Sequence, residues 1–504
     1  MNLKKIIAGA FADDDPRYRT ASPVSMLFCS AGSGAKQAMY ILMMYASYMA
    51  NVGFGVAVTV TGVILTVKGV FDGAIDPFLA AIYDRMPVRK FGKMRFFMIV
   101  GWGLSVTAAL LMFFFLPGRF EGVPGIVAFV IVYFMFVIGY STMGIGVTTV
   151  PAILTNNPKQ RPFLSFTATV YQYLVPMIIT TVLSFKILPK HNNQYDAACL
   201  SEAVWIFVAI SAVLVFLACI GMAKVDTPEV LGELVTNGGT KEEKIGLRDM
   251  WNFVVQNKPM RAYLVTGITD KIANNALSQS TITTLLNGVL IGSYTATTMI
   301  GNAGMIIGMI AGFFGGAVIA KFGTKKAVTV FSWLSIATVV ATTVFMIILG
   351  PKDMKSIAHA GIPMVIFIAL SMIKRVVTMM LNVGEGMMRA DIVDYELERS
   401  GNYMPGMVGA IYTFTEQIIA SFGATISAFA IAAIGYVNKV PQMGDEATWS
   451  VLIVVLLITE ALPAVGWLCN IIAMKFYPLS KERMEEVQTN IYERKMEAKK
   501  AMGK

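Results

Sequence analysis

Two aspartates inside a long apolar segment are the residues of this chain best placed to do chemistry. Asp72 and Asp76 stand four residues apart, so in a helix both side chains project from one face. An ionisable side chain at membrane depth is costly and marks a functional site, and two acids together cost more. If this segment crosses a membrane, the pair predicts a site for a cation or a proton.

The composition of the chain is that of a membrane protein. Only 14% of the 504 residues are charged and 56% are hydrophobic, whereas a soluble domain carries roughly 25% charged residues. A helix needs about 20 predominantly apolar residues to span a bilayer. The sequence predicts twelve such spans, at residues 24–50, 54–83, 96–117, 123–150, 163–188, 200–223, 261–292, 294–320, 327–350, 361–388, 406–437 and 448–476.

The lysines and arginines of the loops predict how these spans are oriented. The loops after the second, sixth and eighth spans are basic, whereas those after the first and seventh hold no lysine or arginine. Since basic loops stay in the cytoplasm, we expect both termini to be cytoplasmic. The first span is too long for a signal peptide and follows a polar tail, so we expect no cleavage there. In a bacterial-type cell the chain would be a multi-pass protein of the inner (plasma) membrane.

The prediction is an all-α integral membrane fold with twelve transmembrane helices in two six-helix bundles. The bundles take residues 24–223 and 261–476 and are joined by a cytoplasmic loop at 224–260. Cytoplasmic tails take residues 1–23 and 477–504, and the second tail is a polar helix candidate rich in lysine and glutamate. We expect a monomer surrounded by membrane lipid.

Several function classes are excluded by the residue content. The chain has two histidines and four cysteines without a CxxC pair, so we expect no histidine-rich metal site, Ser-His-Asp hydrolase or disulfide framework. It has no Gly-Lys-Ser/Thr motif for ATP-driven transport. The net charge of +10 comes from the loops and does not indicate nucleic-acid binding. We therefore expect no enzyme activity and no cofactor beyond a coupling ion.

A short repeat relates the two halves. Lys90-Phe91-Gly92-Lys93 follows the second span, and Lys321-Phe322-Gly323-Thr324-Lys325 follows the eighth, which is the equivalent place. Such a duplication, with a basic glycine turn after the second helix of each half, resembles the pattern of major facilitator transporters. In that architecture the substrate site lies near the membrane midplane between the halves, which rock to give alternating access.

Two further motifs sharpen the resemblance. The first is Phe71-Asp72-Gly73-Ala74-Ile75-Asp76-Pro77, followed by Asp84-Arg85 and by Arg89-Lys90-Phe91-Gly92-Lys93. The second is Arg389-Ala390-Asp391-Ile392-Val393-Asp394-Tyr395-Glu396. From about residue 24 to residue 480 the chain resembles the glycoside-pentoside-hexuronide:cation symporters, the melibiose permease family, in helix two and between helices ten and eleven.

The resemblance assigns a cation site to Asp72, Asp76 and Ser141. Ser141 stands where a helix-four threonine completes the family's site, whereas Ile75 replaces an asparagine and removes an oxygen ligand. By analogy with calcium, sodium needs several oxygen ligands, whereas protonation needs no such shell. Two nearby carboxylates also tend to share one proton, because the first charge resists the second. The coupling ion is therefore expected to be a proton or sodium.

Other charged residues accompany the pair. Lys68 lies one turn before Asp72 and is either a counter-ion that competes with the coupling cation or a lysine that merely neutralises a buried carboxylate. Glu460, in the last span, has no evident partner. Four charged residues at cytoplasmic helix ends are expected to form a network that holds one access state closed: Asp84, Arg85, Asp391 and Asp394.

Substrate recognition departs from the melibiose branch of the family. That branch grips sugar with acids on helices one and four, whereas here helix one carries Lys36, and the helix-four position is Gly144. A galactoside such as melibiose is therefore not implied. The candidate cavity residues are Lys36, Tyr40, Gly144, Thr148, Asp270, Asn274, Lys374 and Arg375.

The polar residues of the second half leave alternatives open. Asp270 and Asn274 share one face of the seventh span, which either lines a cavity or packs against a neighbouring helix. Lys374 and Arg375 lie mid-way along the tenth span. They either receive an anionic group together with Lys36 or pair with a buried acid.

These patterns predict a secondary active symporter. It would couple inward proton or sodium movement to uptake of a glycoside, pentoside or hexuronide by alternating access. The expected partner is a small sugar-like solute, anionic if the basic residues contact it. Because the family's grip residues are absent, a non-sugar amphipathic or carboxylated solute is an alternative. A membrane sensor or lipid-handling protein on the same scaffold is a second alternative.

Overall fold

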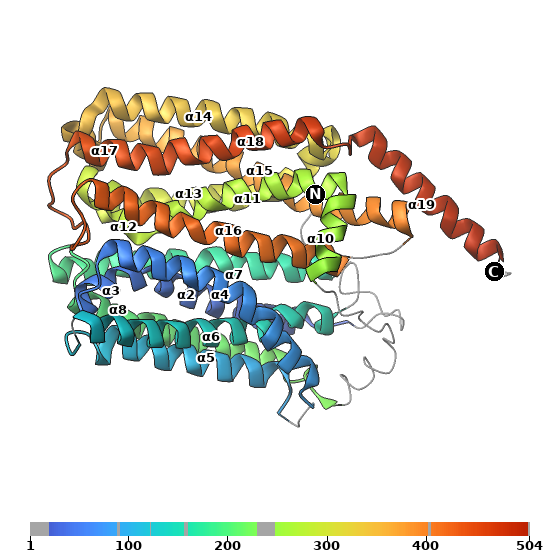
Figure 1. The fold of residues 1–504 in the computed structure, drawn as a ribbon, viewed down its shortest axis with the longest axis horizontal. Helices are drawn as coiled ribbons and strands as arrows, with labels where there is room; N and C mark the ends of the chain where they lie inside the picture. Colours follow the sequence, from blue (N-terminus) through green and yellow to red (C-terminus); the bar gives the residue numbers. More distant parts are fainter. Residues whose placement is uncertain are drawn as a thin grey trace. The chain divides into compact units, whose positions relative to one another are not determined.

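The computed structural model describes residues 20–87, 91–120, 122–155, 160–228, 247–401 and 405–501. Within these ranges every regular element is a helix (Figure 1), because in lipid a helix satisfies each backbone group within its own segment. The chain divides into two compact units. Unit 1 comprises residues 1–241 with Tyr436–Val440, and unit 2 comprises residues 242–435 and 441–504.

The helices of unit 1 begin and end at recognisable sequence signals. The Ser22 side chain caps the first helix by accepting the Ser25 N–H at 3.2 Å, and Pro23 takes the first helical position. Gly55, at φ 66°, ends α3. The elements are α2 (Pro23–Met44), α3 (Ala46–Phe54), α4 (Val58–Arg85), α5 (Met94–Leu110), η1 (Leu111–Phe115), α6 (Gly122–Leu154), α7 (Arg161–Val182), η2 (Leu183–Ile187), η3 (Leu188–His191) and α8 (Ala197–Met222).

Unit 2 contains the second series of long helices and a C-terminal helix. Asn257 caps α11 by accepting the Met260 N–H at 2.9 Å. The elements are α10 (Leu247–Gln256), α11 (Lys258–Ser278), α12 (Ser280–Thr284), η4 (Leu285–Leu290), α13 (Tyr294–Phe322), α14 (Thr324–Asp353), η5 (Met354–Ala358), α15 (Ile362–Ser400), α16 (Pro405–Ala433), α17 (Trp449–Leu456), η6 (Leu457–Ala461), α18 (Leu462–Phe476) and α19 (Lys481–Ala501).

The same helix pairings occur within each unit. In unit 1, α2 packs against α7 and α8, and α6 packs against α4 and α5. In unit 2, α11 packs against α16 and α18, and α15 packs against α13 and α14. Likewise α5 contacts α8 as α14 contacts α18. The internal order of helices therefore repeats from one unit to the other.

Ten helices of the described ranges are long and apolar enough to cross a membrane. The expected first and seventh spans are not among them; they correspond to α2 with α3, and to α11 with the short apolar helix Ser280–Leu290. Polar side chains explain this, since α2 carries Lys36 and α11 carries Asp270 and Asn274. The number of twelve spans remains a prediction.

Two predicted boundaries differ from the structure. The segment 224–260, expected as a loop, contains the helix α10, and α11 begins at Lys258 rather than at 261. The segment Tyr436–Val440, expected in the second bundle, belongs to unit 1. It does so because the Val437 carbonyl accepts the Val58 N–H at 3.0 Å, next to the start of α4.

A buried carboxylate fixes the turn between α4 and α5. Asp226, 0% exposed, accepts the backbone N–H groups of Lys93 and of Arg95, each at 2.8 Å. Gly92, at φ 91°, passes so close to Asp226 that a Cβ at this position would collide with the carboxylate. The glycine of the first basic turn is therefore required by this contact.

Candidate functional site

Helix α4 brings Lys68 and Asp72 together on one face. Their ammonium and carboxylate groups form an ion pair across one helical turn, and Asp72 is only 7% exposed. The Ser141 hydroxyl of α6 donates to Oδ1 of Asp72 at 3.4 Å, which is a long and therefore weak hydrogen bond. The structure thus places Lys68, Asp72 and Ser141 in one cluster.

Asp76 follows one turn later in α4 and is half-buried. It interacts electrostatically with Lys36 of α2, as Asp72 also does. Two carboxylates and two ammonium groups, those of Lys36 and Lys68, therefore share this region of unit 1, and their formal charges balance. Charges at membrane depth are tolerated when each finds an opposite charge nearby.

Lys36 extends from α2 to Gly144 in α6. A Cβ at position 144 would lie 2.8 Å from the Lys36 Nζ atom, so glycine leaves the room that the ammonium occupies. The same Nζ lies 5.1 Å from the centroid of the Tyr140 ring, within cation–π range. At position 144, where the melibiose branch carries an acid, this chain has a glycine that a lysine of another helix contacts.

Tyr40 and Thr148 are the other predicted cavity residues of unit 1. Tyr40 lies one turn after Lys36 in α2 and is half-buried. Thr148 is exposed, and its hydroxyl donates to the Gly144 carbonyl at 3.0 Å, so this bond stays within α6. Since α6 contacts both α2 and α4, the cluster draws its residues from three packed helices.

At the aspartates of this cluster, one positively charged group can be replaced by another. One Asp72 oxygen contacts Lys68, and the other accepts from Ser141. A proton needs a single carboxylate oxygen, whereas hard metal cations take a shell of several oxygens. Ile75, between the two acids, offers no side-chain oxygen. The side-chain oxygens of this cluster are therefore those of two carboxylates and one hydroxyl.

A second polar cluster lies in unit 2. The Asn274 amide donates to Asp270 Oδ2 at 2.7 Å, and Asp270 is buried whereas Asn274 is exposed. Lys271 is a cation of this cluster, since it interacts electrostatically with Asp270, with Glu385 of α15 and with Glu416 of α16. Sequence reasoning misses Lys271, because two of its acidic partners lie on other helices and single-helix spacing does not show them.

Lys374 and Arg375 do not form one basic site. The Lys374 Nζ atom lies 2.7 Å from Oε2 of Glu460, the acid for which the sequence shows no partner. Arg375 is exposed and runs along α13, where a Cβ on Gly308 would lie 3.1 Å from the Arg375 Cγ. Of the two alternatives for Lys374, the structure shows pairing with a buried acid.

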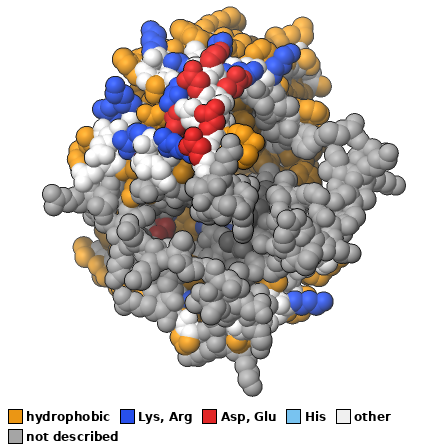
Figure 2. All heavy atoms as spheres, turned by 90° about the vertical axis from the view of Figure 1, so that its right-hand side faces the viewer, with side chains coloured by type: hydrophobic (Ala, Val, Ile, Leu, Met, Phe, Trp, Pro, Cys, Tyr) orange, Lys and Arg blue, Asp and Glu red, His pale blue; other side chains and the backbone are white. Residues whose placement is uncertain are grey.

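The acidic end of α15 is tied to α19. Asp394 Oδ2 accepts the Gln488 amide of α19 at 2.7 Å, and Asp391 is half-buried. Figure 2 faces the end of the molecule at which α19 lies and shows acidic and basic side chains gathered there. The side chains of Asp84 and Arg85 lie outside the described residues, so the predicted gating network stays a prediction.

Comparison with known proteins relates the chain to sugar transporters. The family model described as "MFS/sugar transport protein" matches residues 27–481. In Escherichia coli (strain K12), the "Putative glycoside/cation symporter YagG" is 21% identical, covering 89% of this chain and 90% of its own. The "Glucuronide carrier protein homolog" of the same organism is 22% identical over 89% and 90% of the two chains.

The fold is also similar to that of solved transporters. A bacterial homologue of the human lysosomal transporter Spinster, in an inward-facing and unoccupied conformation, matches with a TM-score of 0.59. The two sequences are 12% identical, and the match covers 92% of this chain and 97% of that one. At this identity the likeness concerns the fold alone.

Proposed function

The chain belongs to the MFS/sugar transport protein family, and from this membership we propose that it couples inward proton movement to uptake of a sugar-like solute. It is a multi-pass membrane transporter, as the family and the apolar helices require. The observation that carries the choice of a proton is the burial of the Asp72 carboxylate, one turn from a second acid, since burial and a like charge both disfavour the ionised form. Such a group takes up a proton without needing the oxygen shell that sodium requires.

Coupling follows from the shared charges of this cluster. Protonation of Asp72 removes a partner from Lys68, and protonation of either aspartate changes the electrostatic balance around Lys36. A solute that contacts Lys36 then binds with a different affinity in the protonated and deprotonated states. Because such coupling is reciprocal, the solute also favours one protonation state, which links the two binding events.

The proposed solute is a glycoside, pentoside or hexuronide. One relative is named as a glycoside/cation symporter and another as a glucuronide carrier homologue, which supports this class. Lys36, held beside Gly144 and Tyr140, offers a donor for a sugar hydroxyl or a uronic carboxylate.

A carboxylated non-sugar solute is the second candidate. It is favoured by the same lysine, because the α2 helix carries no acid to grip sugar hydroxyls, and Gly144 stands where the melibiose branch has one. Lys36 would then be the anchor for the carboxylate. Uptake of hexuronides together with their neutral parent glycosides supports the sugar, whereas uptake of organic acids alone supports the second candidate.

The proposed placement is the inner membrane, with a monomer and with both termini in the cytoplasm. It is supported by the basic loops after the second and eighth expected spans. Reporter fusions at residues 228 and 504 test it, since both should report the cytoplasmic side. A fusion at residue 193, in an expected outer loop, should report the opposite side.

The decisive experiment is solute uptake by the purified protein in liposomes. An inward proton gradient should drive accumulation, and a sodium gradient alone should not. Asp72→Asn and Asp76→Asn should abolish accumulation while exchange of solute across the membrane continues. Glu202→Gln, which alters an acid near the surface of the same unit, is the matched control and should accumulate solute normally.

Three results would count against the proposal. Accumulation that persists in both aspartate variants would separate the acids from coupling. Accumulation driven by sodium alone would replace the proton as the coupling ion. Failure of any glycoside, uronide or organic acid to cross in either direction would favour the sensor or lipid-handling alternative.

A further inference from the structure

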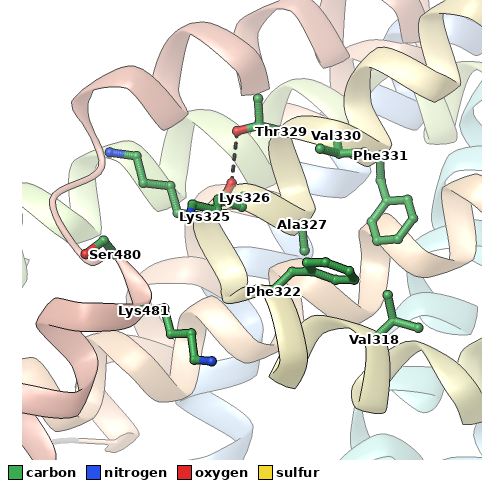
Figure 3. Close-up of a pocket in the computed structure, with 10 residues that line it drawn as sticks. All are labelled: Val318, Phe322, Lys325, Lys326, Ala327, Thr329, Val330, Phe331, Ser480 and Lys481. Atoms are coloured by element: carbon green, nitrogen blue, oxygen red, sulfur yellow. Dashed lines mark hydrogen bonds between the residues drawn. The ribbon is translucent and has the colours of Figure 1, made fainter.

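Unit 2 has a cavity that the proposed transport does not use. Its volume is about 720 Å³, within the range of small-molecule sites. It lies where α13 ends, α14 begins and α19 begins (Figure 3). The basic turn at residues 321–325, which sequence analysis singled out as half of a repeat, forms part of its wall.

The walls of this cavity, which we call the α19 pocket, are almost wholly apolar, although lysines are among the residues that line it. Figure 3 shows the rings of Phe322 and Phe331 on one side and Ser480 and Lys481 on the other. Phe322 is 54% exposed and Val330 is 53% exposed, so the apolar side opens on the surface of the helices. In a membrane-spanning bundle such a surface meets lipid chains.

Three of the residues that line the α19 pocket are lysines, namely Lys325, Lys326 and Lys481. The Lys325 ammonium donates to the Tyr477 carbonyl at 2.6 Å, so it is partly used within the unit. The Lys481 ammonium donates to the Lys321 carbonyl at 3.3 Å, and Lys326 is exposed. An ammonium has three donors, so Lys326 and Lys481 keep donors for a ligand.

The carboxylates around the α19 pocket do not balance these lysines. The pKa of Glu482 lies below its ordinary value, first because its backbone N–H and Ser480 bond the carboxylate, with Lys326 and Lys481 adding to the effect. Asp391 of α15 interacts with residue 324 at the start of α14 but does not line the pocket. Of the described residues that line the pocket, three are lysines and none is an acid.

The equivalent turn of unit 1 shows what is missing. There the segment after α8 brings Asp226 onto the turn, where its carboxylate accepts backbone N–H groups and Arg95. In unit 2 the segment after α18 brings a lysine instead: a Cβ on Gly323 would lie 2.8 Å from the Cβ of Lys481. The turn of unit 1 carries its own buried anion, whereas the turn of unit 2 gains a cation.

We propose that the α19 pocket binds an anionic phospholipid, with its phosphate against Lys326 and Lys481 and an acyl chain against Phe322 and Val330. The surplus of positive charge selects an anion, and basic pockets between helices are known to take acidic headgroups. The exposed apolar wall selects a ligand with a hydrocarbon chain. A free phosphate would leave that wall uncovered.

Native mass spectrometry of the full-length protein tests this site. The probes are phosphatidylglycerol and phosphatidylcholine, each added to the detergent-solubilised protein. Phosphatidylglycerol should be retained preferentially, and the double variant Lys326→Gln/Lys481→Gln should weaken its binding by about tenfold or more, as the loss of two lysines near a phosphate implies. Val330→Trp keeps every lysine but fills the apolar side, and it should also lower retention.

The matched control removes two other lysines, one at the opposite end of α14 and one in η5. Lys352→Gln/Lys355→Gln should retain phosphatidylglycerol as the unaltered protein does. Equal retention of the two lipids, or unchanged retention after Lys326→Gln/Lys481→Gln, would overturn the proposal. So would full displacement of phosphatidylglycerol by millimolar inorganic phosphate, or unchanged retention in Val330→Trp, since either would show a surface charge effect without a chain-binding pocket. The outcome does not depend on solute uptake.

Discussion

The ammonium of Lys374 lies 2.7 Å from Oε2 of Glu460 and ties α15 to η6 within unit 2. The Thr459 carbonyl also accepts from this ammonium, at 3.0 Å, and the Thr459 hydroxyl donates to Oε1 of Glu460 at 3.2 Å. Every oxygen of the carboxylate therefore has a donor. This link engages Lys374 within the unit.

The first prediction concerns the stability of this link. Lys374→Met leaves the Glu460 charge buried without a partner, so we expect the free energy of unfolding to fall by about 3–5 kcal/mol. Lys374→Met combined with Glu460→Met removes both charges and should recover most of that loss. Unfolding in detergent measures both variants. If the double variant is as unstable as the single one, the unpaired Glu460 charge is not the cause of the lost stability.

The second prediction concerns the contact between Gly144 and Lys36. Gly144→Ala places a Cβ 2.8 Å from the present position of the Lys36 Nζ atom, and the flexible lysine must move away. Stability should change little, whereas the KM for uptake should rise by about tenfold, as the loss of one charge-assisted hydrogen bond implies.

The control for this variant is Gly103→Ala, because a Cβ there meets nothing within 4 Å. Liposome uptake at a series of solute concentrations measures the KM of both. An unchanged KM for Gly144→Ala would remove Lys36 from the solute site.

The third prediction concerns the turn held by Asp226. Gly92→Ala combines an unfavourable φ of 91° with a collision against the Asp226 carboxylate. The unfavourable φ alone should cost about 1–3 kcal/mol, and the collision adds to it. Gly118→Ala has φ 73° but meets nothing within 4 Å, so it measures the cost of φ without the collision. Equal shifts of the unfolding midpoint for the two variants would contradict the prediction.

The fourth prediction concerns the attachment of α19. Arg483 pairs with Glu398 at the end of α15 at 2.6 Å, and Asn490 donates to the same carboxylate at 2.6 Å. Because Arg483 is partly exposed, Arg483→Gln should cost no more than about 1 kcal/mol. Amide hydrogens of α19 should nevertheless exchange faster, while those of α18 should not change.

Glu486→Gln is the control for this variant, since it removes the other, exposed partner of Arg483. It should leave the exchange of α19 amides close to that of the unaltered protein. Faster exchange in the control than in Arg483→Gln would show that the pair within α19, and not the pair with Glu398, protects these amides.

Local patterns were sufficient to predict the helices and the position of the acidic pair. Apolar stretches indicated the long helices, because spanning a bilayer requires a continuous apolar segment. Spacing placed Lys68, Asp72 and Asp76 along one helix, since residues four apart share a face. The pairing of Lys68 with Asp72 lies within that single turn, and the structure shows it.

Contacts between distant residues were not predictable in the same way. Lys36 with Gly144, Lys374 with Glu460 and Gly92 with Asp226 each join different helices or turns. Nothing in the spacing along one helix shows which residue of another helix it will meet. The partner of Glu460 and the role of Lys271 therefore appeared only in the folded chain.

The amino-acid sequence by itself determined that this is a membrane protein, that its elements are helices and that two acids lie one turn apart on one of them. Those properties depend on hydrophobicity and on the helical repeat, which neighbouring residues set. Only the tertiary structure decided which charges neutralise each other and which lysines remain available to a ligand. That choice depends on helix packing, which brings together side chains far apart in the sequence or keeps them apart.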